Sequence, residues 1–301
     1  MDGLWLGEEA CHDVQLVGGK AANLSRLAAD YRVPVGFCMT PGLRARWLDG
    51  FAGLHARWSD GLQRETPSQP ALPQGFYDAV SRDYQEMAIR CRLAEPTVAV
   101  RSSAIEEDGL KSSFAGQYDT YLNIRGAEEI AVAIVKCWDS VTGERMSSYR
   151  KEHNLPAESS GVAVLVQQLI PAEVSGVVFS ANPISGSKDE VMINSTWGLG
   201  ESVVSGKVTP DTLIVRKADF KIKDKYVGEK GLMTVLGEKG TKDVSVPISH
   251  RRTFTLDAEK SREITQLALD LESRMGWPVD LEFAYYANDL YLLQCRPITT
   301  L

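Results

Sequence analysis

The chain has 301 residues, of which 44% are hydrophobic and 24% are charged, so a packed globular core is expected. The formal net charge of −7 argues against broad electrostatic binding to nucleic acid or to an anionic membrane. No apolar run approaches the roughly 20 residues that span a bilayer, and the acidic start lacks the layout of a signal peptide. Five scattered cysteines without a CxxC pair predict a cytoplasmic protein with reduced thiols.

The first half of the chain mixes helical and strand-like segments. Gly18-Gly19-Lys20 precedes apolar residues at helical spacing, which predicts a helix that starts beside these glycines. Residues 58–74 are polar and rich in proline and predict a loop. The stretch 98–104 predicts a short buried strand, 121–124 another strand, and 128–149 a long helix with one buried face.

Three segments of this half are candidates for binding phosphate. Lys20 at a helix start could meet an anion together with backbone N–H groups, although a glycine turn before a surface lysine gives the same pattern. Arg101 ends a buried-looking strand beside two serines and suits a phosphate clamp, or else an ion pair with a nearby glutamate. In the segment 113–120, Gly116 would let the backbone approach a phosphate, or would form a plain turn.

The second half is rich in strands. Strands are predicted at 162–170, 175–183, 190–195, 212–217 and 220–228, followed by a helix from an Asp257 cap to Gly276. This change of character near residue 165 predicts a division into residues 1–164 and 165–301. The glycine-rich turn at 198–202 carries Glu201 but lacks the third glycine of a dinucleotide-binding fingerprint.

The last two strand-like segments predict a hairpin with a polar face. Residues 279–286 and 290–297 flank a predicted three-residue turn, 287–289. In that register Glu282 faces Gln294 and Asp280 faces Arg296, while the other face is apolar or aromatic. A carboxylate and an amide oxygen suit Mg²⁺, and a guanidinium matches phosphate oxygens. A solvated face with a surface ion pair is the alternative.

Eight segments together resemble a known family. They occur in the order GGKAANL, VPVGF, VAVRSSAIEED, SFAGQYDTYLNI, SGVVFS, WGLGESVVSG, DLEFA and LLQCRPITTL. This order resembles the nucleotide-binding domain shared by phosphoenolpyruvate synthases, pyruvate phosphate dikinases and rifampin phosphotransferases, and the resemblance covers nearly the whole chain. It implies an α+β fold of the ATP-grasp type, with two lobes that close on ATP and Mg²⁺.

The resemblance also implies roles for individual residues. Lys20 and Arg101 would grip the phosphates of ATP, and Arg296 would stabilise charge on the transferring group; these three would be the catalytic cations. Glu282 and Gln294 would hold Mg²⁺. The remaining ATP-binding positions would form three features. The loop over the phosphates would contain Gly116, Gln117 and Thr120. The hinge edge against adenine would be formed by Gln168, Leu169 and Ile170, and the ribose would be bound by Glu201.

In such enzymes a swivelling domain carries a histidine that takes a phosphoryl group from ATP and delivers it to an acceptor-binding domain. This chain ends at Leu301 without either domain, so we expect both to be supplied in cis or in trans. VPVGFCMT, SFAGQYDTYLNI and RPITTL resemble the rifampin enzymes slightly more, which favours an antibiotic phosphotransferase. The alternatives are a phosphoenolpyruvate synthase-like domain or split subunit, and a regulatory module that binds nucleotide without transferring phosphate.

Overall fold

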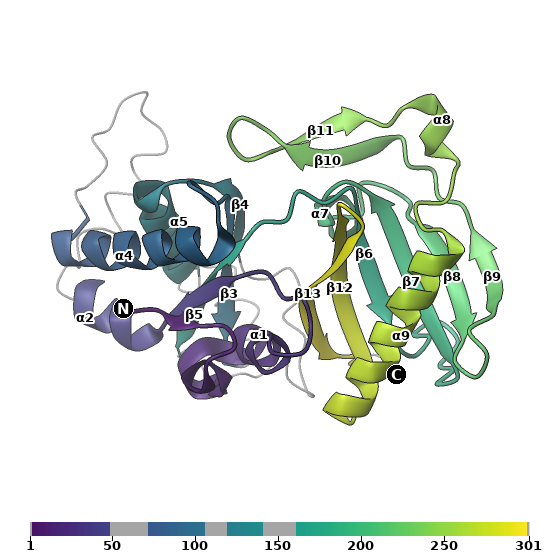
Figure 1. The fold of residues 1–301 in the computed structure, drawn as a ribbon, viewed down its shortest axis with the longest axis horizontal. Coiled ribbons are helices and arrows are strands. Elements are labelled where there is room, and N and C mark those ends of the chain that lie inside the picture. The colour runs from purple at the N-terminus through teal and green to yellow at the C-terminus, as the bar shows by residue number, and fades with distance from the viewer. Residues whose placement is uncertain (1, 49–71, 106–118, 141–160, 300) are drawn as a thin grey trace. The chain divides into compact units, whose positions relative to one another are not determined.

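The computed structural model describes residues 2–48, 72–105, 119–140, 161–299 and 301, which form two compact units (Figure 1). The first unit contains the described parts of 1–25, 35–107 and 114–169, and the second contains those of 26–34 and 170–301. Each unit has its own sheet and helices, which confirms the predicted α+β class. The predicted boundary at 164/165 falls inside a strand of the first unit, whereas the two units divide after Leu169.

The first unit is built on a five-stranded antiparallel sheet with the strand order β1-β2-β5-β3-β4. Its strands are β1 (Leu4–Trp5), β2 (Gly36–Met39), β3 (Val98–Ala104), β4 (Thr120–Ile124) and β5 (Val162–Gln168). The helices in this part of the chain are the 3₁₀-helix η1 (Glu9–His12), α1 (Val14–Leu27), α2 (Pro41–Leu48), α4 (Gln74–Cys91) and α5 (Ala127–Ser140).

Helices α4 and α5 pack together on this sheet, and the apolar residues of both explain why (Figure 1). Ile130, Ile134 and Trp138 recur at helical spacing on α5 and are buried, so the predicted one-sided helix is confirmed as far as Ser140. Residues 141–149 of that prediction, and 58–71 of the predicted loop, lie outside the described residues. Helix α4 was not predicted, although Phe76, Val80 and Met87 bury one of its faces.

The second unit is built on a six-stranded antiparallel sheet with the order β13-β12-β6-β7-β8-β9. Its strands are β6 (Val174–Phe179), β7 (Glu190–Trp197), β8 (Asp211–Arg216), β9 (Ile222–Tyr226), β12 (Val279–Tyr286) and β13 (Asp289–Pro297). A separate two-stranded hairpin and three helices complete the unit, namely β10 (Leu232–Leu236) with β11 (Thr241–Ser245), α7 (Glu201–Val204), α8 (Ile248–Arg251) and α9 (Ala258–Met275).

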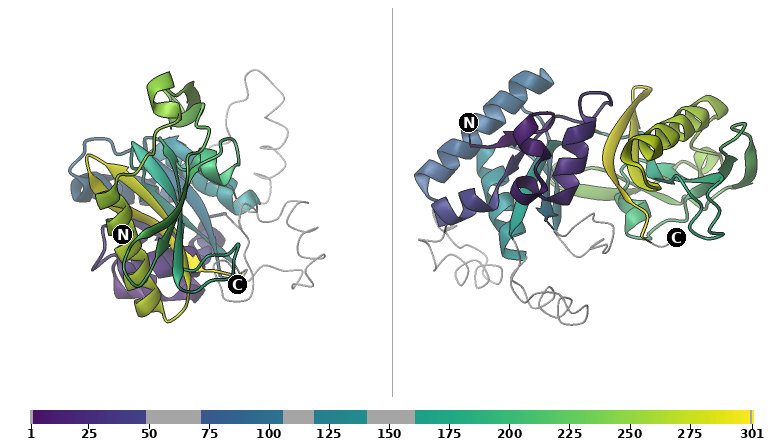
Figure 2. Two further views of the ribbon diagram at one scale, coloured as in Figure 1. Left: turned by 90° about the vertical axis from the view of Figure 1, so that its right-hand side faces the viewer. Right: turned by 90° about the horizontal axis from the view of Figure 1, so that it is seen from below.

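Helix α9 crosses one face of the six-stranded sheet, as Figures 1 and 2 show. Its start is capped by Asp257, whose Oδ1 accepts a hydrogen bond of 2.8 Å from the backbone N–H of Lys260. It ends at Gly276, which has a φ of +75°. Both ends are where the sequence predicts them. Because α9 covers one face with Ile264 and Leu271 buried, the opposite face of the sheet carries the polar side chains described next.

Candidate functional site

The polar end of the β12–β13 hairpin has the predicted register. Asp280 pairs with Arg296, Leu281 with Cys295, and Glu282 with Gln294. Leu281 and Cys295 are fully buried on the apolar face. Because side chains alternate along a strand, the carboxylates, the amide and the guanidinium project together from the other face. We call Asp280, Glu282, Gln294 and Arg296 the hairpin group.

The turn of this hairpin is not the one predicted. Tyr286 pairs with Asp289, so the turn has two residues, Ala287 and Asn288, rather than three. Both have positive φ, +50° and +67°, as a type I′ turn requires, and such a turn matches the twist of the strands. A β-bulge between Glu282 and Phe283 absorbs the extra residue of β13. The bulge therefore restores the predicted pairing at the hairpin group.

Within the hairpin group, Arg296 is fixed by Asp280. Nε and Nη2 of Arg296 both lie 2.8 Å from Oδ2 of Asp280. Burial raises the pKa of Asp280 to about 6; the charge of Arg296 opposes this shift and that of Glu282 adds to it. Gln294 is also buried, whereas Glu282 is half-buried. A guanidinium held in this way is pre-organised to meet phosphate oxygens.

The face that carries the hairpin group continues across the sheet. Glu282 pairs with Val177 of β6, Val177 pairs with Asn194 of β7, and Asn194 pairs with Thr212 of β8. Thr212 Oγ1 donates a hydrogen bond of 2.8 Å to Asn194 Oδ1. This polar pair was not singled out from the sequence, because its strands are not neighbours of the hairpin in the chain.

A second group of predicted residues gathers in the first unit, and we call Lys20, Arg101 and Thr120 the α1–β3 group. Arg101 of β3 and Thr120 of β4 are cross-strand partners. The Lys20 side chain is buried, and its Nζ donates a hydrogen bond of 2.9 Å to the backbone oxygen of Ser102. The ammonium is thereby fixed beside the strand that carries Arg101.

Gly18 makes this approach of α1 to β3 possible. It interrupts the helix with a φ of +76°, and a Cβ there would lie 2.2 Å from the backbone oxygen of Ser103. Only glycine adopts this conformation readily and tolerates such a close backbone contact. Three residues later, the N–H of Ala21 donates to Ser103 Oγ at 3.2 Å. The predicted helix start at Gly18-Gly19-Lys20 is therefore a place where the backbone of α1 closely contacts that of β3.

The other predicted ATP-binding residues are placed as follows. Gly116 and Gln117 lie outside the described residues. Gln168 and Leu169 donate backbone hydrogen bonds of 2.8 Å within the first unit, and Ile170 starts the last segment of the second unit. Glu201 begins α7 in the second unit, and its Oε2 accepts a hydrogen bond of 2.9 Å from Thr241 Oγ1. The roles of all these residues stay predictions.

The hairpin group is suited to a metal that arrives with its ligand. Among the described residues, no group of three or more His, Cys, Asp or Glu side chains is arranged to hold an ion by itself. Mg²⁺ is commonly held by one or two protein oxygens, with phosphate oxygens and water completing its octahedron. Glu282 and Gln294, cross-strand neighbours on one face, offer a carboxylate and an amide oxygen and fit that donor set.

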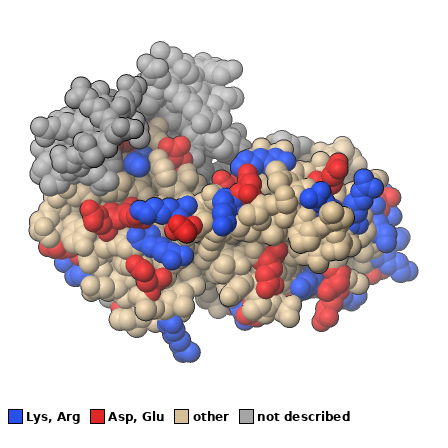
Figure 3. All heavy atoms as spheres, turned by 90° about the horizontal axis from the view of Figure 1, so that it is seen from above, with Lys and Arg blue, Asp and Glu red and all other residues tan. Residues whose placement is uncertain are grey.

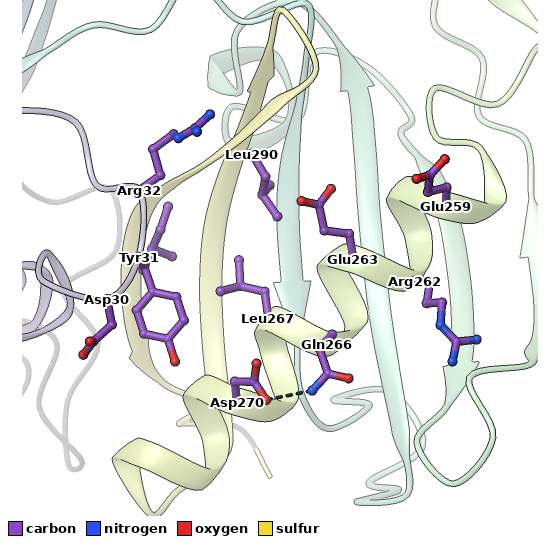
Figure 4. Close-up of a pocket in the computed structure, with 11 residues that line it drawn as sticks. Asp30, Tyr31, Arg32, Glu259, Arg262, Glu263, Gln266, Leu267, Asp270 and Leu290 are labelled. Atoms are coloured by element: carbon purple, nitrogen blue, oxygen red, sulfur yellow. Dashed lines mark hydrogen bonds between the residues drawn. The ribbon is translucent and has the colours of Figure 1, made fainter.

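A cavity outside these two groups lies beside α9. A cavity of about 530 Å³ in the second unit lies between α9 and residues 30–32. Figure 4 shows its lining, with the hydrogen bond of 2.7 Å from Gln266 to Asp270, and it contains none of the predicted site residues. Figure 3 shows side chains of both charge signs on the face that it displays. Among the helices that the structure describes, none combines the length and the apolar character that crossing a bilayer would require.

Comparison with known families identifies the family of this chain. The profile of the family described as "Pyruvate phosphate dikinase, AMP/ATP-binding domain" matches residues 14–301. The chain belongs to this family. The match includes both the α1–β3 group and the hairpin group.

Three curated relatives show the range of proteins that contain such a domain. The chain is 39% identical to a probable phosphoenolpyruvate synthase of Methanocaldococcus jannaschii, over 99% of this chain and 26% of the relative. It is 36% identical to the uncharacterized phosphotransferase YvkC of Bacillus subtilis, over 98% and 35%. It is 35% identical to the prodigiosin synthesizing transferase PigC of Serratia marcescens, over 94% and 32%. The chain thus spans about a quarter to a third of the length of these relatives.

Proposed function

We propose that this chain is the Mg·ATP-binding part of a dikinase-type phosphotransferase. Two phosphoryl groups leave ATP and AMP remains: one passes to a histidine on a separate swivelling domain, and the other is transferred to water and leaves as phosphate. The observation that carries the proposal is the pairing of Glu282 with Gln294 beside that of Asp280 with Arg296, on one face of a single hairpin. Family membership supports the nucleotide as ligand.

The proposed chemistry needs positioning and charge neutralisation more than covalent help from the protein. Bound Mg²⁺ would be held by Glu282 and Gln294 and would neutralise phosphate charge. Arg296 would meet the transferring group, and Lys20 and Arg101 would bind phosphate oxygens from the first unit. Glu201 would bind the ribose, while residues 168–170 would line the adenine.

The acceptor of the phosphoryl group is best proposed from the relatives. The expectation of a rifampin-phosphotransferase-like enzyme rested on three short segments, and none of the three relatives above bears that name. The one with the highest identity of these three is named as a phosphoenolpyruvate synthase, which supports the synthase-like alternative. The name of the prodigiosin synthesizing transferase supports the proposal that such a domain can serve other acceptors. We therefore place the choice of acceptor in a further domain, in cis or in trans.

Calorimetric titration of ATP with and without Mg²⁺ tests the metal site. Wild type should bind Mg·ATP more tightly than metal-free ATP, because Glu282 and Gln294 would hold the metal and its charge would neutralise that of the phosphates. Glu282→Gln keeps the shape of the side chain but removes its charge, so affinity for Mg·ATP should fall by at least about tenfold. Glu259→Gln is the matched control, because Glu259 is an exposed carboxylate of α9.

Two results would count against the proposal. Binding of ATP that is indifferent to Mg²⁺ and to Glu282→Gln would indicate a regulatory nucleotide pocket rather than a phosphotransfer site. Equal losses of affinity in Glu282→Gln and Glu259→Gln would show that charge in general, rather than a metal at the hairpin group, controls binding.

A further inference from the structure

The hairpin β10–β11 reaches Glu201 from a distant part of the chain. Thr241, the first residue of β11, donates the 2.9 Å hydrogen bond from its Oγ1 to Oε2 of Glu201, which starts α7. Within the described part of the chain, Oε1 of this carboxylate has no hydrogen-bond partner. A carboxylate has about four acceptor positions, so one oxygen can be fixed by Thr241 while the other stays available to a ligand.

The backbone of the hairpin is itself fixed against the turn that precedes Glu201. The N–H of Leu199 donates to the backbone oxygen of Thr234 at 2.8 Å. Gly198 has a φ of +75°, and a Cβ there would lie 2.4 Å from the same oxygen. Asp243 of β11 accepts from Thr234 Oγ1 at 2.7 Å and from Lys207 Nζ at 3.0 Å. The Thr241 hydroxyl is therefore held at a set place relative to Glu201.

A buried ion pair anchors the base of the hairpin to the sheet. Lys230, two residues before β10, is fully buried, and its Nζ contacts Oδ1 of the buried Asp211 in β8. The same Asp211 accepts from the N–H of Gly228 at 2.9 Å and from the N–H of Thr255 at 2.8 Å. Because a buried charge is costly once its partner is lost, this pair holds the hairpin firmly.

We propose that Thr241 is a positioning residue whose hydroxyl aims the Glu201 carboxylate at the sugar of the nucleotide. The β10–β11 hairpin thereby sets a preference for ribonucleoside over deoxyribonucleoside triphosphates, since a carboxylate is a strong acceptor for sugar hydroxyls. This inference rests on the proposed function, in which Glu201 meets the ribose. It adds that Thr241 orients Glu201, and that this orientation selects ribonucleoside triphosphates.

Calorimetric titration with Mg·ATP and with Mg·2′,3′-dideoxy-ATP tests the inference. Wild type should prefer ATP by about tenfold or more, the effect of a hydrogen bond to a charged acceptor. Thr241→Val keeps the size of the side chain and loses the hydroxyl, so affinity for ATP should fall while that for the dideoxy analogue changes less than about twofold. Thr241→Ser should restore the preference. Thr253→Val, which removes a hydroxyl bonded to His250, is the matched control.

The outcomes separate this inference from the proposed function. Equal loss of affinity for both nucleotides in Thr241→Val would show a merely structural role and overturn the inference. Wild type that binds both nucleotides equally well, with Mg²⁺ dependence intact, would also overturn it but would leave the proposed function standing. Absence of any ATP binding by the wild type would overturn both.

Discussion

Replacement of Gly18 by alanine should both destabilise the first unit and weaken nucleotide binding. Gly18 lies two residues before Lys20, at the point where the backbones of α1 and β3 come closest. If the position of Lys20 depends on that approach, separating the two backbones must move the ammonium away from Arg101. The substitution therefore tests a structural contact and a binding role together.

Two costs add at Gly18. A φ of +76° with a ψ of 168° lies in a region that is essentially restricted to glycine, and it costs an alanine roughly 1–3 kcal/mol. The added Cβ would also lie 2.2 Å from the backbone oxygen and 2.5 Å from the backbone carbon of Ser103. Backbone atoms cannot rotate away as a flexible side chain does, and overpacking of this kind costs about 1–3 kcal/mol. The sum is about 2–6 kcal/mol, a large share of the stability of an ordinary domain.

Gly126→Ala is the matched control, because it carries the cost of a positive φ without the steric cost. Gly126 lies in the same unit with a φ of +75°, and an added Cβ would meet nothing within 4 Å. In urea denaturation its unfolding free energy should fall by roughly 1–2 kcal/mol, against the larger loss in Gly18→Ala. Calorimetry should show weakened Mg·ATP binding in Gly18→Ala and unchanged binding in Gly126→Ala.

Equal unfolding free energies for the two variants would refute the steric part of this reasoning. Equal ATP affinities, with Gly18→Ala less stable, would refute the link between the backbone contact and Lys20. A loss of binding in both variants would mean that left-handed backbone strain alone disturbs the site.

Two further substitutions test buried charges. Lys230→Met should lower the free energy of unfolding by about 3–5 kcal/mol, because Asp211 is then buried without its cation. In urea denaturation, the double variant Lys230→Met with Asp211→Asn should recover much of that loss. Failure to recover it would contradict the buried-pair explanation. Asp83 is fully buried under the N-terminal segment, and burial raises its pKa above the unfolded value of 3.8. The protonated carboxyl therefore contributes to the stability of the folded state below pH 3.8, and this contribution is lost as the pH rises through the folded pKa. Asp83→Asn, which keeps an acceptor for the N–H of Gly3, should therefore raise the melting temperature more at pH 7.5 than at pH 4, and an equal shift at both pH values would contradict this.

The hairpin group shows how far the sequence alone can specify a site. Alternation of apolar and polar residues places Leu281 and Cys295 on the buried face, and this requirement sets the pairing of Glu282 with Gln294. The same pattern does not say where an extra residue is accommodated. A three-residue turn and a two-residue turn with a bulge give the same faces at this end, and the positive φ of Ala287 shows that the chain adopts the second.

The strands and helices with strong periodicity were predictable, and contacts distant in sequence were not. Residues 98–104 and the cap of α9 follow from local patterns and were predicted. The β10–β11 hairpin was missed, although Gly237 and Gly240, which bracket its turn, carried a signal for it. The bond from Thr241 to Glu201 joins residues 40 positions apart, and nothing in either segment indicates the other.

The charges of the hairpin group explain why a metal belongs to the proposed function. Asp280 and Glu282 lie on the same face as Arg296, so a polyphosphate that approaches the guanidinium also approaches two carboxylates. Repulsion between these like charges would offset the attraction of Arg296, which is already engaged by Asp280 at 2.8 Å. A divalent cation held by Glu282 would offset that repulsion, because its charge would attract both the carboxylate and the phosphates. A site built only to hold an anion would gain from neutral residues at positions 280 and 282, and the carboxylates there favour a site built for a metal–phosphate complex.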